Sequence, residues 1–145
     1  MKLVLQRVTR ASVCVDGRSI AVIAKGLLIL FGSEKQDGSD KVDYLADKAL
    51  RLRIFPDAQG KMNLSCLDIS GEVLVVSQFT LAGDCTKGRR PGFDNAAEPK
   101  AAESLYRQFI ERVSESGLKV EEGQFGADMQ VELVNDGPVT FILDR

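Results

Sequence analysis

The chain has 145 residues, of which 44% are hydrophobic and 28% are charged, and its formal net charge at pH 7 is −2. This composition excludes a disordered or fibrous protein, and a chain of this length is expected to bury roughly 68–70% of the surface that its unfolded form exposes. Histidine is absent, which excludes Ser-His-Asp triads, Cys-His dyads and zinc sites of the H-E-x-x-H type.

The first part of the chain predicts a sheet. Short runs rich in β-branched residues are separated by the turn signals Asp16-Gly17 and Lys25-Gly26, which favours an antiparallel meander. The runs cover Lys2–Val8, Ala11–Val15, Arg18–Ala24 and Gly26–Gly32.

An amphipathic helix is expected next, with Asp40 as its N-cap. Its apolar residues recur at helical spacing and should pack on the sheet: Val42, Leu45, Ala46, Ala49 and Leu50. The segment Phe55–Gly60 then predicts a turn.

The run Gly71–Leu81 begins apolar and becomes polar, which indicates a buried central strand that emerges at a site. A second helix follows, with Pro99 in its first turn and Gly117 after its end. Its apolar stripe comprises Ala102, Leu105, Tyr106, Phe109, Ile110 and Val113.

Two last strands are predicted, Met129–Val134 and Val139–Leu143, around a tight connection at Asn135–Pro138. The whole chain, residues 1–145, therefore predicts a single α+β domain with a mainly antiparallel, barrel-like sheet and two amphipathic helices.

Several kinds of chemistry lack their motifs. The chain has no G-x-x-x-x-G-K-[ST] or G-x-G-x-x-G segment, so ATP and NAD are not expected, and no cofactor or metal is predicted. Cys14, Cys66 and Cys85 are widely spaced and should be reduced thiols, of which only Cys85 has a nearby cation, Lys87. No apolar stretch could span a membrane and no signal peptide is seen, so we expect a cytoplasmic protein.

Two polar segments remain open from the residues alone. Ser77 and Thr80 stand at the polar end of a predicted strand, but a hydroxyl nucleophile needs a base and none is nearby, so they are either site residues or strand-end hydrogen-bonding residues. The Gly/Pro-rich loop Lys87–Gly92 is cationic and is either a solvated loop or a phosphate contact, with Lys87, Arg89 and Arg90 as the candidate residues.

Taken together, Ser77–Leu81 (SQFTL) and Asn135–Thr140 (NDGPVT) resemble the two signature segments of the D-aminoacyl-tRNA deacylases, also called D-tyrosyl-tRNA deacylases. One departure is Gly92, where the family's Arg-Pro-Ser-Phe segment is expected to have serine. Other segments resemble that family in order over essentially the full length: Gln6–Val8, Ala11–Val13, Arg53–Phe55, Gly60–Leu64, Arg90-Pro91 with Phe93, and Phe125–Met129.

The resemblance implies a homodimer that hydrolyses the ester joining a D-amino acid to the terminal adenosine of tRNA. It implies a cis Gly137–Pro138 bond whose turn enters the partner subunit's site and rejects L-amino acids. The implied catalytic segment is Ser77, Gln78, Phe79 and Thr80, and the implied supporting residues are Arg7, Met129, Val139 and Thr140. Arg7 is expected to hold the turn in orientation, and glycyl-tRNA mischarged on other tRNAs is an expected second substrate.

An aminoacyl ester beside a ribose hydroxyl is already activated, so a held water and hydrogen bonds to the developing oxyanion can supply most of the rate. We therefore favour backbone amides around Phe79 and Thr80 as oxyanion donors, with Thr80 as a covalent nucleophile the alternative. Two other functions stay open. One is a non-catalytic tRNA- or nucleic-acid-binding module that uses Lys87–Arg90 with Phe79 or Phe93, and the other is a sibling deacylase that acts on L-aminoacyl-tRNA.

Overall fold

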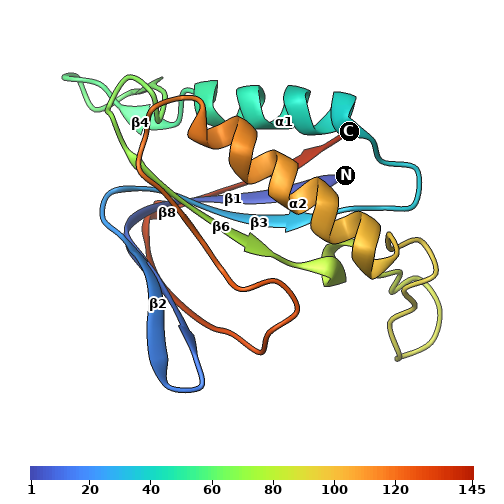
Figure 1. The fold of residues 1–145 in the computed structure, drawn as a ribbon. Helices are drawn as coiled ribbons and strands as arrows, with labels where there is room; N and C mark the ends of the chain where they lie inside the picture. Colours follow the sequence, from blue (N-terminus) through green and yellow to red (C-terminus); the bar gives the residue numbers. More distant parts are fainter.

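The computed structural model describes all residues from 1 to 145 and consists of a strongly curved sheet with two helices on one face (Figure 1). Six strands form the main sheet in the order β2-β1-β3-β6-β7, and β8 pairs with β1. The main strands are β1 (Lys2–Val15), β2 (Arg18–Ile23), β3 (Gly26–Gly32), β6 (Glu72–Ser77), β7 (Val120–Glu122) and β8 (Gln130–Asp144), and β4 (Phe55–Pro56) and β5 (Met62–Leu64) form a separate hairpin. The α+β prediction is confirmed.

β1 is one continuous strand, not the two that were predicted. Its first half pairs with β3 and its second half with β2, both antiparallel, while β8 occupies its other edge. The predicted meander is therefore wrong, because β3 returns beside β1 instead of beside β2. A 14-residue strand is long enough to hold both shorter strands along one edge.

The sheet is mixed, because β3, β6 and β7 are parallel to one another. Parallel neighbours need crossover connections, and the chain supplies them with α1 (Ser39–Arg51) between β3 and β6 and α2 (Pro99–Ser114) between β6 and β7. The central position of β6 explains its apolar sequence, and four of its residues are buried: Val73, Leu74, Val75 and Val76.

Both helices turn their predicted apolar stripes inward. All five predicted residues of α1 are buried, and so are Leu105, Tyr106, Phe109 and Val113 of α2. The predicted cap is wrong: the N-cap of α1 is Gly38, and Asp40 lies in the first helical turn, where an acidic charge interacts favourably with the helix dipole. Pro99 begins α2, as predicted.

The core has two parts, one on each face of the sheet. The larger cluster of 21 buried residues fills the space under the helices, where the ring of Phe31 lies 5.2 Å from that of Phe109. The smaller cluster of eight residues lies on the other face, where the β1–β2 hairpin curls. Full burial of a large apolar side chain contributes about 1.5–3 kcal/mol, so both clusters stabilise the fold.

β8 replaces the two predicted last strands and their tight connection. Thr140 pairs with Gln6 and Asn135 with Val8, so four β8 residues, 136 to 139, stand opposite the single β1 residue Arg7. The segment that resembled a hairpin turn is therefore a bulge within one long strand. Both flanking segments still pair with β1, because that strand continues past the bulge.

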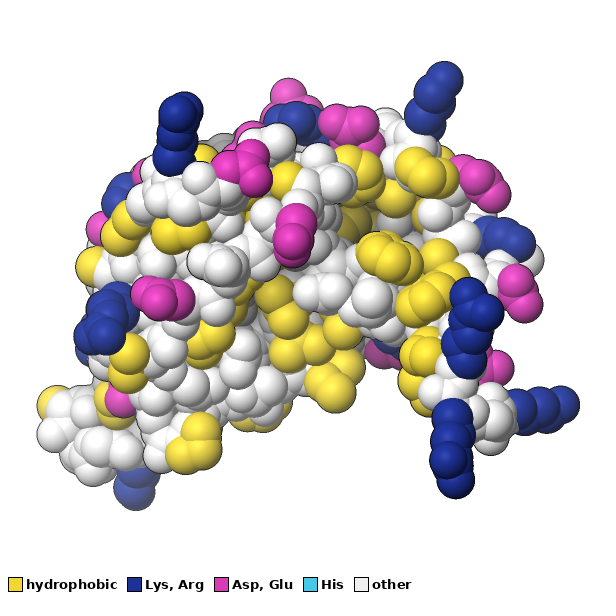
Figure 2. All heavy atoms as spheres, turned by 90° about the horizontal axis from the view of Figure 1, so that it is seen from below, with side chains coloured by type: hydrophobic (Ala, Val, Ile, Leu, Met, Phe, Trp, Pro, Cys, Tyr) yellow, Lys and Arg dark blue, Asp and Glu magenta, His cyan; other side chains and the backbone are white.

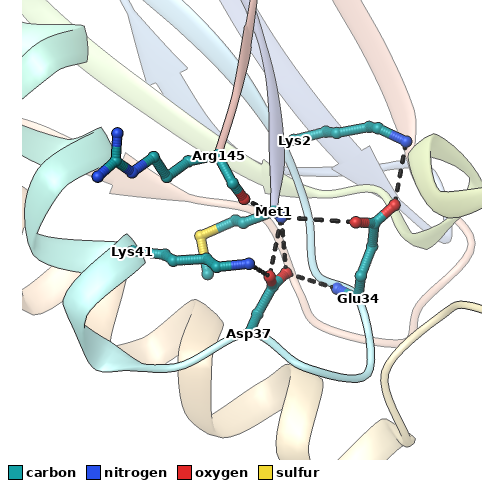
Figure 3. A network of polar contacts seen from close by, with 6 residues as sticks. All are labelled: Met1, Lys2, Glu34, Asp37, Lys41 and Arg145. Carbon is teal, nitrogen blue, oxygen red and sulfur yellow. Dashed lines mark hydrogen bonds and ion pairs between the residues drawn. The ribbon is translucent and has the colours of Figure 1, made fainter.

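The two chain ends meet in a polar network beside α1 (Figure 3). The Met1 ammonium donates to Asp37 Oδ1 and to the Arg145 carbonyl oxygen, each at 2.9 Å. Asp37, whose side chain is 1% exposed, also accepts from Lys41 Nζ at 2.8 Å and from the Glu34 N–H at 2.7 Å. One buried carboxylate thus joins β1, the β3–α1 loop and α1.

Candidate active site

A pocket of ≈ 510 Å³ opens where β6 leaves the sheet. Nine of its 15 lining residues are hydrophobic, which with a few polar groups is the usual character of a ligand site. Its wall includes the last residue of β6 and the two residues after it (Ser77 to Phe79), the start of α2 (Pro99 and Ala102) and the loop before β8 (Phe125 to Met129). Seen from below, the molecule has a hollow in which hydrophobic side chains gather, with Lys and Arg side chains projecting around its outline, several of them at the lower right (Figure 2).

Ser77 and Gln78 contribute polar groups to this pocket. The Gln78 N–H donates to the Phe31 carbonyl oxygen at 2.7 Å, after which the chain leaves the sheet and forms a short 3-10 helix, η1 (Phe79–Ala82). The Gln78 side-chain amide donates to Thr80 Oγ1 at 2.5 Å. Ser77, Gln78 and Phe79 line the pocket, whereas Thr80 is exposed beside them and is not part of its wall.

Behind the pocket, the Tyr106 hydroxyl links β6 to Gly123, the residue that follows β7. It contacts the Val75 carbonyl oxygen at 2.8 Å and that of Gly123 at 3.2 Å. Burial raises the pKa of Tyr106, so the hydroxyl keeps its proton at neutral pH. The ring also packs on Phe125, at 5.8 Å between centroids. Tyr106 therefore supports the pocket wall through Phe125 and does not itself line the pocket.

The thiols are separate from the pocket. Cys66 is buried, and that burial raises its pKa to about 12, so it is not a thiolate nucleophile at neutral pH. Cys14 is half-buried, and Cys85 is exposed in the basic loop. No group of three or more His, Cys, Asp or Glu residues is placed to hold a metal ion.

The second predicted part of the site, the bulge of β8, lies apart from the pocket. The Gly137–Pro138 bond is cis, as the resemblance implied, and both residues are exposed. Arg7, 8% exposed, donates through Nε to the Asp136 carbonyl oxygen at 2.8 Å and through Nη1 to the Ile54 carbonyl oxygen at 2.5 Å. Neither Gly137 nor Pro138 lines the pocket of its own chain.

The basic loop lies beside the pocket, and its two ends are joined by backbone hydrogen bonds. Asp84 and Gly92 exchange both backbone hydrogen bonds, at 2.8 and 2.9 Å, and so join the two ends of the loop. Phe93 then packs on Phe79, with ring centroids 5.1 Å apart. Between these ends, the three predicted cations are exposed and form no ion pair: Lys87, Arg89 and Arg90.

The structure divides the predicted site residues into three groups. Met129 joins Ser77, Gln78 and Phe79 at the pocket, the cations lie on the neighbouring loop, and Arg7, Val139 and Thr140 lie with the β8 bulge. Sequence reasoning missed Ala102, whose helical spacing assigned it to the core although it lines the pocket. It also missed Asp128 and Ala127 as lining residues, because a loop has no periodicity to reveal its orientation.

Comparison with known proteins identifies relatives over the full length. A family model described as D-Tyr-tRNA(Tyr) deacylase matches residues 4–144. The D-aminoacyl-tRNA deacylase of Geotalea uraniireducens (strain Rf4) is 58% identical and that of Clostridioides difficile (strain 630) is 57% identical, each covering 99% of this chain and 93% and 97% of its own length.

Two solved structures share the fold. One is the c-Myc DNA Unwinding Element Binding Protein, with a TM-score of 0.94, 42% identity and coverage of 100% of this chain and 99% of its own. The other, a probable eukaryotic D-amino acid tRNA deacylase, has a TM-score of 0.87 at 17% identity, covers 99% and 98% of the two chains, and shows the fold alone.

The fold, the pocket at the end of its central strand and the full-length relatives define the chain as an enzyme, a hydrolase. It belongs to the D-Tyr-tRNA(Tyr) deacylase family. No helix of the structure is long and apolar enough to cross a membrane.

Proposed function

We propose that residues 1–145 form one deacylase domain that hydrolyses the ester of D-aminoacyl-tRNA in the cytoplasm, releasing a free D-amino acid and tRNA. The observation that carries this proposal is the 58% identity to a D-aminoacyl-tRNA deacylase over 99% of the chain. The pocket supports it, because the segment that resembles the family's catalytic signature, Ser77 to Phe79, lines it.

Deacylation is tested directly by incubating the protein with D-tyrosyl-tRNA, L-tyrosyl-tRNA and mischarged glycyl-tRNA and following loss of the ester. We expect loss of the D-ester, slower loss of the glycyl ester and only slow residual loss of the L-ester. Faster loss of the L-ester than of the D-ester would favour the sibling deacylase. Binding without any loss would favour the nucleic-acid-binding module, and the 42% identical relative of solved structure is named for binding DNA.

For the chemical step, we propose that backbone groups do most of the work. The N–H groups of Phe79 and Thr80 stand in the first turn of η1, where a helix offers them no acceptor of its own, so they are free to bind a developing oxyanion. The substrate's 2′-hydroxyl and a held water complete the reaction. Thr80 Oγ1 already accepts a hydrogen bond from Gln78, and no imidazole exists in the chain to take its proton.

Thr80→Ala is therefore expected to lower kcat/KM for D-tyrosyl-tRNA by no more than about ten-fold, since it removes an orienting contact and not a nucleophile. Single-turnover deacylation measures this, with Thr9→Ala on the exposed part of β1 as the matched control. A loss of about 10⁴-fold with folding and tRNA binding intact would instead make Thr80 the nucleophile.

We further propose a homodimer in which the Gly137–Pro138 turn of one subunit enters the pocket of the other. Two features support this arrangement: the turn is exposed and absent from its own pocket, and β8 carries exposed apolar side chains, with Ile142 71% and Phe141 38% exposed. Backbone carbonyls of the turn would accept the substrate ammonium and leave room only for hydrogen on one side of Cα, so an L side chain collides. Glycine has hydrogen on both sides and is only weakly rejected.

The loop cations are proposed to contact tRNA phosphates beside the pocket. A variant with Lys87, Arg89 and Arg90 all changed to Gln is expected to bind tRNA about ten-fold more weakly at 0.1 M salt and to lower the slope of log K against log salt by about 2. Binding titrations at several salt concentrations measure both quantities.

The matched control for this loop variant changes Lys25, Lys48 and Lys61 to Gln, since these cations are exposed and carry the same total charge. Its expected affinity and salt slope stay close to those of the unmodified protein. Equal weakening by the two triple variants would show a net-charge effect and would contradict a specific role for the loop.

A further inference from the structure

We propose that Asn135 is a positioning residue: its side-chain amide holds the exit of the Gly137–Pro138 turn, and selection between D- and L-esters depends on that hold. The expected effect on ester selection rests on the proposed function. The hydrogen bonds of Asn135 do not depend on that function. Residues 136 to 139 stand opposite Arg7 alone, so the regular β1–β8 ladder cannot pair them all.

The Asn135 amide supplies what the ladder lacks at Val139. Asn135 Oδ1 accepts from the Val139 N–H at 2.5 Å, and Asn135 Nδ2 donates to the Val139 carbonyl oxygen at 3.1 Å. One side chain thus bonds both backbone groups of the same residue, as a neighbouring strand would. Unpaired backbone groups cost free energy when they are removed from water, and Val139 is only 6% exposed, so this pairing stabilises the closed turn.

A third bond fixes the plane of the amide. Asn135 Nδ2 also donates to Thr140 Oγ1 at 3.1 Å, and Gln6 Nε2 of β1 contacts the same oxygen at 3.4 Å. Thr140 is where β8 resumes its pairing with β1. The amide therefore ties the turn to the first residue of the restored ladder.

The two ends of the turn are held by different residues. Arg7 bonds the Asp136 carbonyl oxygen at the entry, and its Nε lies 3.4 Å from Asp136 Oδ2. Asn135 bonds Val139 at the exit, and the exposed residues Gly137 and Pro138 lie between these two anchors. Loss of the exit anchor would leave the turn attached at one end, and the direction of its carbonyl groups would change. Only an amide of this length offers both an acceptor and a donor to Val139.

The test compares Asn135→Ala and Asn135→Asp with the unmodified protein. Asp keeps an acceptor for the Val139 N–H but replaces the donor with a second oxygen. Two quantities are measured: the ratio of kcat/KM for D- and L-tyrosyl-tRNA, and the hydrogen-exchange rate of the Val139 amide. We expect the ratio to fall at least ten-fold in both variants, and the Val139 exchange rate to rise at least ten-fold in Asn135→Ala.

The matched control is Asn63→Ala, which removes another half-buried amide, bonded to Asp57 Oδ2 at 3.1 Å in the β4–β5 hairpin. It should change neither quantity. An unchanged D/L ratio in a folded Asn135 variant, or the same fall in Asn63→Ala, would overturn the inference. If Asn135→Ala fails to fold, the ratio of kcat/KM for D- and L-tyrosyl-tRNA measured in Asn135→Asp tests the inference. If the unmodified protein cleaves no ester, the proposed function fails. Independently of that function, an unchanged exchange rate of the Val139 amide in Asn135→Ala would show that Asn135 does not hold Val139.

Discussion

Replacing Gly137 by alanine is expected to lower kcat/KM for D-tyrosyl-tRNA by about 100-fold or more, since a displacement of about 1 Å in a positioning group has an effect of that size. Gly137 has φ +148°, a backbone conformation that L side chains rarely adopt. An added Cβ would lie 2.6 Å from Val139 Cγ2 and 3.3 Å from Arg7 Nη2. Both neighbours anchor the turn, so the turn itself must move.

Gly17→Ala is the matched control for this variant. Gly17 also has a positive φ, +74°, but an added Cβ meets no atom within 4 Å, and the residue lies in the β1–β2 turn. We expect this control to lose about 1 kcal/mol of stability and to keep its deacylation rate. Full activity in Gly137→Ala would show that the Gly137–Pro138 turn takes no part in the active site.

Asp37→Asn is expected to lower the free energy of unfolding by about 3 kcal/mol or more, because removing one partner of a buried ion pair leaves the other charge uncompensated. The Met1 ammonium and Asp37 lie 2.9 Å apart with side chains 0% and 1% exposed, and Lys41 shares the same carboxylate. Urea unfolding at pH 7 measures the change.

The control for this second variant is Asp47→Asn on α1. Asp47 pairs with Arg51 at 2.7 Å, but the two side chains are 53% and 67% exposed, so water screens the pair. Its expected effect on the unfolding free energy lies within the error of the measurement. Similar losses in the two variants would show that the network at the chain ends is not a special source of stability.

The Asp37 carboxylate also makes the stability of the protein depend on pH. Burial alone would raise the pKa of Asp37, but hydrogen bonds from Lys41, the Glu34 N–H and the Met1 ammonium outweigh it and hold the pKa below its ordinary value of 3.8. The unfolded chain therefore binds this proton first as the pH falls. The contribution to stability is complete above about pH 5 and is lost in more acidic solution, and Asp37→Asn should show a shallower loss.

The sequence predicted the elements better than their pairing. The helical stripes of α1 and α2 and the apolar run of β6 are local patterns, and all three elements form where they were expected. β1 and β8 were each divided in two, because polar residues inside a strand look like its end. Both continue because each has the other as a long partner, which is a contact between opposite ends of the chain.

The candidate site was predictable only in part. The segment Ser77–Thr80 was singled out because an apolar strand becomes polar there, and three of its residues, Ser77, Gln78 and Phe79, line the pocket at the end of β6. The contacts of Asn135 with Val139 could not be predicted, since they depend on a bulge that no periodicity reveals. The proposed chemistry rests on backbone N–H and carbonyl groups, which every residue carries and which only the folded chain arranges.

Subunit mixing tests the central claim, that the turn of one subunit completes the pocket of another. One parent is Gly137→Ala, with an intact pocket, and the other is Ala127→Trp, whose bulky side chain fills the pocket but leaves the turn intact. Each parent alone should be inactive on D-tyrosyl-tRNA. The mixed dimer has one site with an unmodified pocket and an unmodified turn, so we predict deacylation at about half the rate of the unmodified dimer. Mixed dimers as inactive as their parents would show that the turn serves its own subunit or none, and would contradict the account.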